Sequence, residues 1–357
     1  NAPMNKYKVN YDAIDTFKKN IEAHLTKNLA NLVTSDFADE SLTKDLDDFN
    51  PLKLVNTASI NTGHTGIWWG ALLFIPKYNY IVSAGNEGKI KVWDYYSQKL
   101  IHSFQAHNGW IAKLYYIEDS NYLLSGGKDG KIKVWDLSEN LNLRCMFKEH
   151  TKEIYSMDYI TEYRLVVSGG NDGTVKIWDP ENGEMVQSIE ANGENFRAIC
   201  YMQNTGKLAT GLKSGEIFIF KIGKISSSLL YSIKFNEMSG ILCLKYIPSE
   251  DLLVSGEIDG KISFWSVGDT EANCIKAYQA NGAIYNIQIF YQKDCLFYTN
   301  DDNKWKVLKL SNGEIICEYA GNSNPQKGGT ALCGMGVGYN VITGFTDEIK
   351  IWNYSSY

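Results

Sequence analysis

Three histidines of the sequence are each followed at a regular distance by a serine and an acidic residue, a combination that can carry nucleophilic catalysis. The sets are His107, Ser125 and Asp129; His150, Ser168 and Asp172; and His64, Ser83 and Glu87, the last with one extra residue. In a hydrolase the histidine takes the proton of the serine hydroxyl, and the acid orients the imidazole. Such a triad exists once, beside a cleft and an oxyanion hole. Three copies predict a structural motif instead, and we assign no catalytic residue.

A tryptophan closes each of the three sets and marks a longer repeat along the chain. Segments 83–94, 125–136 and 168–179 are close copies that end in Trp-Asp, and weaker copies follow them. The seven copies end at Trp93, Trp135, Trp178, Phe220, Trp265, Leu308 and Trp352. Successive copies lie 42 to 45 residues apart. A regular period of this length predicts a fold built from repeated units.

The residues inside each copy predict strands. Residues 131–135 alternate polar and apolar side chains, which is the pattern of a half-buried strand. Asp129-Gly130 and Asp172-Gly173 lie between two such runs, where a two-residue hairpin turn needs residues that tolerate a positive φ. The sequence therefore predicts an all-β protein.

The repeat length and the Gly-His and Trp-Asp pairs resemble those of the WD-repeat family. The resemblance runs from about residue 52 to the C-terminus, with three strong and four degenerate copies. It implies a seven-bladed β-propeller over residues 51–357, with four antiparallel strands per blade around a central channel. The last copy lacks its outermost strand, and we expect the strand-like segment 54–60 to complete it and remove the exposed edges.

The resemblance also implies a role for the histidine sets. In the family the acid accepts a hydrogen bond from the histidine, the histidine from the serine, and the serine from the tryptophan N–H. The residues of this expected network are His64, Ser83, Glu87, Trp93, His107, Ser125, Asp129, Trp135, His150, Ser168, Asp172 and Trp178. A buried polar chain of this kind makes a blade rigid if every member is satisfied. The four weaker copies lack parts of the set and are expected to be less rigid.

The face at the channel mouth is where partners of the family usually bind. Alignment of the copies places several large side chains on this face, which have the composition of interface hot spots. The predicted partner-binding residues are Trp68, Trp110, Tyr155, Arg197, Tyr285, Lys128 and Asn171. The alternative is that one or both tryptophans pack between blades.

An N-terminal extension, residues 1–50, precedes the predicted propeller. Residues 11–33 carry apolar side chains every three or four positions, which predicts an amphipathic helix. This helix could pack on the propeller, or it could pair with a second chain as a docking helix or the end of a coiled coil. In layout, the second arrangement resembles the G-protein β subunit, whose N-terminal helix pairs with a γ subunit.

The composition narrows the classes of function. The 357 residues carry a net charge of −6, so we expect no nucleic-acid partner. No apolar run is long enough to span a bilayer, and no metal or phosphate motif is present, so we expect no cofactor and no metal. Seven scattered cysteines suit a cytoplasmic protein with free thiols, the nucleus not being excluded. The sequence predicts a non-enzymatic scaffold or substrate-recognition module; a G-protein β-type subunit and an enzyme built on a propeller are the alternatives.

Overall fold

The structure is a computed structural model. It describes residues 54–138, 140–190, 194–234, 239–290, 294–302, 304–320, 331–334 and 340–354. The N-terminal extension, with the helix predicted over residues 11–33 and its pairing with a second chain, lies outside these residues. Within them the regular elements are β-strands and one 3-10 helix, η2 (Pro76–Tyr78).

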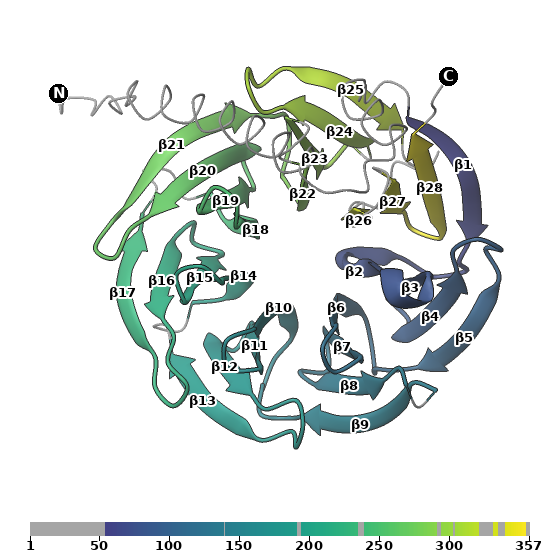
Figure 1. Ribbon diagram of the computed structural model, residues 1–357, viewed down its shortest axis with the longest axis horizontal. Helices are drawn as coiled ribbons and strands as arrows, with labels where there is room; N and C mark the ends of the chain where they lie inside the picture. Colours follow the sequence, from purple (N-terminus) through teal and green to yellow (C-terminus); the bar gives the residue numbers. More distant parts are fainter. Residues whose placement is uncertain are drawn as a thin grey trace, which may run out of the picture.

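The strands form antiparallel meanders that stand side by side in a ring (Figure 1). The eight-stranded sheet contains β2 (Ile67–Ile75), β3 (Tyr80–Gly85), β4 (Lys89–Asp94), β5 (Leu100–Gln105), β6 (Ile111–Ile117), β7 (Tyr122–Gly127), β8 (Ile132–Asp136) and β9 (Asn142–Phe147). Two four-stranded sheets follow, with β10 (Ile154–Ile160), β11 (Leu165–Gly170), β12 (Thr174–Trp178) and β13 (Met185–Glu190), and with β14 (Phe196–Met202), β15 (Lys207–Leu212), β16 (Ile217–Lys221) and β17 (Ser228–Ile233).

Three further four-stranded sheets complete the ring among the described residues. They contain β18 (Ile241–Ile247), β19 (Leu252–Glu257), β20 (Lys261–Val267) and β21 (Ala272–Gln279); β22 (Asn286–Phe290), β23 (Cys295–Thr299), β24 (Lys304–Lys309) and β25 (Ile315–Ala320); and β1 (Leu54–Asn61), β26 (Ala331–Gly334), β27 (Val341–Gly344) and β28 (Glu348–Tyr354). In Figure 1 the first strand of each meander faces the centre of the ring and the fourth lies at its edge.

The eight-stranded sheet is two meanders joined at one point. Strands β2 and β6 lie parallel there, with Gly70 opposite Lys113. A Cβ atom on Gly70 would lie 2.5 Å from the backbone oxygen of Ala112. The lack of a side chain at Gly70 therefore allows the two inner strands to approach closely enough to pair.

The first and last parts of the described chain meet in one sheet. Strand β1 pairs antiparallel with β28 from Leu54 opposite Tyr354 to Asn61 opposite Glu348, as predicted for the segment before the first copy. Leu54 and Ile60 on this strand are buried. The pairing covers an edge of β28 that would otherwise carry free backbone groups.

The turns between the second and third strands differ from the prediction. The chain between β7 and β8 spans residues 128–131, and only Gly130 has a positive φ, of 67°. The N–H of Gly130 donates to the carbonyl of Gly127, which closes a β-turn one residue earlier than Asp129-Gly130. The prediction of a two-residue turn at Asp129-Gly130 was therefore wrong. The Asp129 side chain is held by its bond to His107, and its backbone does not need a positive φ.

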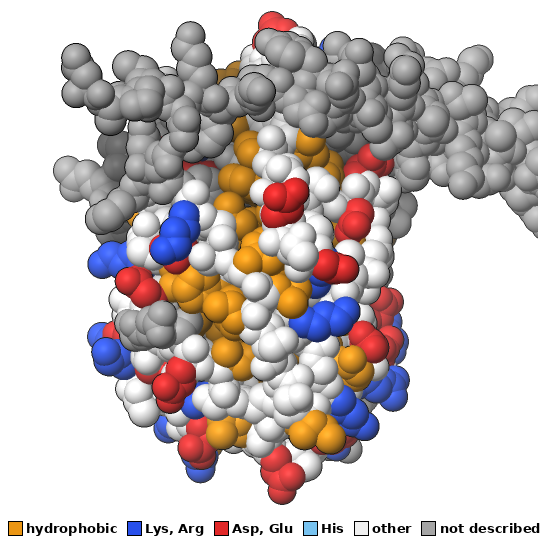
Figure 2. Space-filling model, turned by 90° about the vertical axis from the view of Figure 1, so that its left-hand side faces the viewer, with side chains coloured by type: hydrophobic (Ala, Val, Ile, Leu, Met, Phe, Trp, Pro, Cys, Tyr) orange, Lys and Arg blue, Asp and Glu red, His pale blue; other side chains and the backbone are white. Residues whose placement is uncertain are grey.

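The core lies between neighbouring sheets. Val167 and Ile177 of one sheet share a buried cluster with Phe196 and Phe218 of the next. The outer strands carry exposed apolar side chains, such as Leu229, which is 52% exposed. Figure 2 shows hydrophobic side chains between charged ones on the side of the ring that includes β17. The inner and middle strands thus supply most of the buried surface.

The histidine sets form hydrogen-bonded chains inside the first three meanders. In the second, the Trp135 N–H donates to Ser125 Oγ at 2.9 Å, and Ser125 lies 2.8 Å from His107 Nε2. His107 Nδ1 lies 2.8 Å from Asp129. An ionised carboxylate can only accept, so Nδ1 donates to it, and Nε2 then accepts from the serine hydroxyl. The serine is fully buried, at 0% exposure, and cannot meet a substrate.

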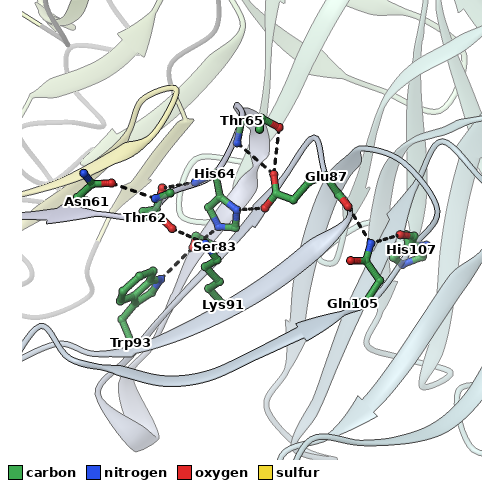
Figure 3. A network of polar contacts seen from close by, with 11 residues as sticks. Asn61, Thr62, His64, Thr65, Ser83, Glu87, Lys91, Trp93, Gln105 and His107 are labelled. Atoms are coloured by element: carbon green, nitrogen blue, oxygen red, sulfur yellow. Dashed lines mark hydrogen bonds and ion pairs between the residues drawn. The ribbon is translucent and has the colours of Figure 1, made fainter.

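The first and third meanders repeat this arrangement. His150 contacts Asp172 and Ser168 at 2.8 Å each, and Trp178 donates to Ser168 at 2.8 Å. Figure 3 shows the first copy, in which His64 contacts Glu87 and lies 3.0 Å from Ser83, which also accepts from Trp93 at 3.0 Å. The backbone N–H of Thr65 donates to the same Glu87 carboxylate at 3.1 Å.

The weaker copies of the repeat keep only part of this series of hydrogen bonds. Trp265 donates to Ser255 at 3.0 Å, and Trp352 donates to Thr343 at 2.8 Å. Thr210 is buried, but its hydroxyl has no hydrogen-bond partner among the described residues, because Phe220 stands where other copies have tryptophan. The uneven copies therefore offer matched positions for measuring what the complete chain contributes.

We expect Ser125→Ala to lower the free energy of unfolding by about 2 kcal/mol or more, because both His107 and Trp135 lose a buried partner. Thr210→Val removes a hydroxyl that makes no bond in the described structure and conserves volume, so it should leave the stability unchanged or raise it. Urea denaturation of both variants measures the two changes. Equal losses of stability in the two variants would show that the hydrogen bonds of the polar chain contribute no stability beyond that of side-chain packing.

The acidic residues of the three hydrogen-bonded histidine sets should make the stability of the protein depend on pH. Burial alone would raise the pKa of Glu87, but hydrogen bonds from His64 and Thr65 outweigh it and lower the pKa from 4.5 to about 2. The same balance between burial and histidine bonding lowers the pKa of Asp129 and Asp172. A pKa that is lower in the folded state stabilises the fold above the unfolded value, and this contribution disappears as pH falls through the folded value.

The melting temperature should therefore fall as the pH is lowered from about 4.5 towards 2. Glu87→Gln removes one of these carboxylates, so its melting temperature should vary less over this interval than that of the unchanged protein. Glu118→Gln, at an exposed position, is the control. Thermal unfolding between pH 5 and pH 2.5 measures the difference, and identical slopes for the two variants would contradict the role given to Glu87.

Candidate channel-mouth interaction site

Three aromatic side chains, two from the inner strands β2 and β10 and one from the residue just before β6, lie against one another at one face of the ring. The rings of Trp68 and Trp110 are stacked, with centroids 4.7 Å apart and planes at 27°. Tyr155 adjoins both, at 5.4 Å from Trp110 and 6.4 Å from Trp68. All three side chains are partly exposed. The structure thus brings together the three aromatic residues that the sequence placed on the channel-mouth face; we call them the aromatic stack.

Arg197 continues the aromatic stack onto the fourth inner strand. Its guanidinium lies 5.1 Å from the centre of the Tyr155 ring, a distance at which a cation is attracted to the ring face. Tyr285 lies beyond Arg197, and its hydroxyl donates to Asp301 at 2.5 Å. Burial and the hydrogen bond to Asp301 together raise the pKa of Tyr285 to about 12, so the hydroxyl keeps its proton and stays a donor.

Lys128 and Asn171 lie in the turns beside this face. The Lys128 N–H donates to the backbone carbonyl of Trp110 at 2.9 Å, and its side chain is exposed. The Asn171 N–H donates to the carbonyl of Glu153 at 2.8 Å, and its side chain bonds to the Glu153 carboxylate at 3.1 Å. Lys128 is therefore available to a partner, whereas Asn171 is already engaged.

A cavity of about 330 Å³ occupies the centre of the ring below this face. Tyr155, Arg197 and Tyr285 line it, whereas Trp68 and Trp110 do not, so the two tryptophans lie outside it. The remaining lining comes from the inner strands β2, β6, β10, β14, β18 and β22.

Sequence reasoning missed several residues of this region. Lys113 and Lys245 line the cavity, and Asn86 accepts a hydrogen bond from the Trp68 N–H at 2.5 Å. The two lysines are charged residues in inner strands that are rich in apolar side chains, and this contrast is a signal that the sequence contains. Asn86 occupies the turn position equivalent to Lys128 and Asn171, so the repeat places it on the same face, although its bond to Trp68 is not evident from the sequence.

The described residues contain little else that could carry chemistry. None of their His, Cys, Asp and Glu side chains form a group of three or more that could hold a metal ion. None of the described segments forms a helix with the length and hydropathy needed to cross a membrane. The site is therefore best described as a surface of aromatic and basic groups above a central cavity.

A comparison of the sequence with models of known protein families finds the same repeat in four segments. The family model described as WD domain, G-beta repeat matches residues 56–94, 98–136, 141–179 and 227–266. The first three segments end at the complete histidine chains, and the fourth ends just after Trp265, which keeps its bond to Ser255. A search of curated proteins found no match. Repeats of this type support a general role as a protein-interaction scaffold. The chain belongs to the WD-repeat family.

Proposed function

We propose that this chain is a non-enzymatic interaction module, a seven-bladed propeller that binds a peptide or protein partner at its channel mouth. The observation that carries the proposal is the aromatic stack of Trp68, Trp110 and Tyr155, extended by Arg197 and partly exposed. The seven blades correspond to the five four-stranded sheets and the two meanders of the eight-stranded sheet.

The composition of this surface favours binding. Trp, Tyr and Arg dominate the binding energy of protein interfaces, where a few large side chains supply most of the affinity. Indole and phenol rings offer a large apolar area together with a polar group that can bond to a partner. A surface of this kind on the mouth of a rigid ring suits a short segment of another protein.

The contacts within the aromatic stack reduce the entropic cost of binding. Trp68 is fixed by its bond to Asn86 and by the ring of Trp110. Side chains that are already ordered lose little conformational freedom when a partner arrives. Packing between blades and contact with a partner are therefore compatible, since the rings hold each other while one part of each stays accessible.

We expect the double variant Trp110→Ala, Tyr155→Ala to lose at least about tenfold of its affinity for partners, because truncating central aromatic residues costs about 2 kcal/mol or more in many interfaces. Affinity capture from cells of the source organism, with quantitative mass spectrometry, identifies the partners that bind the unchanged protein. Titration of one such partner then measures the loss.

The control for this experiment is Tyr96→Ala, which removes an aromatic side chain that is 72% exposed in the connection between β4 and β5. It should bind every partner as strongly as the unchanged protein. Thermal unfolding establishes that both variants are folded. Full binding by a folded double variant would refute the proposed site.

A further inference from the structure

Three cations line the central cavity without a carboxylate among its lining residues. Lys113 comes from β6, Lys245 from β18, and Arg197 from β14. Among the described residues none of the three forms an ion pair, and the Nε atom of Arg197 is buried without a hydrogen-bond partner. Three partly buried positive charges thus line one cavity.

Two of the buried lysines have carboxylate partners, whereas a third, Lys176, donates to Ser188 Oγ at 3.2 Å. Lys207, which is 3% exposed, lies 2.8 Å from Asp269, and Lys306, which is 5% exposed, lies 2.5 Å from Asp302. An unpaired ammonium in such surroundings is costly, because burial removes its hydration. The two channel lysines lack the carboxylate partner that Lys207 and Lys306 have.

One carboxylate lies near enough to act on them, that of Asp158 in β10. It already accepts the N–H of Tyr201 at 2.7 Å and the N–H of Tyr159 at 2.8 Å, and so connects two neighbouring sheets. Even with Asp158 ionised, the three cations leave an excess of two positive charges. Burial and the charge of Lys245 together lower the pKa of Lys113 to about 8, although the charge of Asp158 acts in the opposite direction.

We propose that the central channel is a binding site for a phosphate-type oxyanion, held by Lys113, Lys245 and Arg197. A phosphate group carries close to two negative charges at neutral pH, which matches the excess. Lysine binds phosphate as a point charge, and arginine adds directed N–H donors. The cavity volume of about 330 Å³ lies at the lower end of ligand pockets, so it suits a small anion or one phosphorylated side chain.

This site does not depend on the aromatic stack. Free phosphate could occupy it without any protein partner, and a phosphorylated segment bound at the mouth could also reach it past Arg197. Both sources present the same chemistry to the lysines. An experiment with two ligands distinguishes them.

Isothermal titration with inorganic phosphate and with a phosphoserine tripeptide, in a buffer free of other multivalent anions, tests the site. We expect at least one ligand to bind the unchanged protein, and we expect Lys113→Met and Lys245→Met each to weaken that binding at least tenfold. Lys99→Met removes the same charge from an exposed position and should change nothing. Binding of the tripeptide alone would identify a phosphorylated side chain as the ligand, and binding of phosphate would identify the free anion.

The absence of binding by both ligands, or undiminished binding by the double variant Lys113→Met, Lys245→Met, would overturn the proposal. A second measurement covers the fold itself. Without ligand, replacing one of the two lysines that repel each other across the cavity should raise the melting temperature by a few degrees, because the folded state loses a repulsion. A lower melting temperature for both single variants would show that the lysines stabilise the fold, and this result would also overturn the proposal.

Discussion

Each sheet of this protein has two apolar faces, and four short strands can cover neither face without a neighbour. Buried side chains therefore gather between sheets, as Val167 and Phe196 do from two adjacent ones. Every sheet depends on the one before it and the one after it. The first and last sheets also need neighbours, and the pairing of β1 with β28 provides the contact between them. Ile60 packs there in one cluster with Ile81 and Ile351. The closure is thus a condition for burial of the core as well as a protected edge.

The same closure determines the character of the channel. Because the sheets converge on their first strands (Figure 1), backbone and side chains compete for space there, and Gly70 shows the result at the β2–β6 contact. Polar groups in this region connect neighbouring sheets: Ser156 accepts the N–H of Ile199 at 3.1 Å, and Asp158 accepts that of Tyr201. A side chain that makes no such connection, like that of Lys113, costs stability unless a ligand compensates it.

The sequence predicted the repeat, the strands and the closing strand, because all three follow from periodicity and from local pattern. It also named the histidine sets, whose spacing is a property of the chain itself. It could not establish which rings touch, since the stack of Trp68 on Trp110 depends on the angle between two sheets. The turn at Gly130 was placed wrongly because the bond from His107 to Asp129, which holds the turn, joins residues that are distant in the chain. The two channel lysines stand out in the sequence as charged residues in largely apolar strands. That they line one cavity follows only from the complete ring.

The buried polar chains and the exposed aromatic stack are physically connected. Asp129, held by His107, also accepts the N–H of Asn108 at 3.3 Å, and the preceding turn residue, Lys128, donates its N–H to the carbonyl of Trp110.

The first meander shows the same connection, since Glu87 holds Thr65 and the neighbouring Asn86 accepts the bond of Trp68. A hydrogen bond made deep in the blade thus restricts the loop that carries a ring at the surface. The three complete hydrogen-bonded chains occur in the meanders that supply Trp68, Trp110 and Tyr155, so the same buried bonds that connect the strands of these copies also hold the turns beside the aromatic stack.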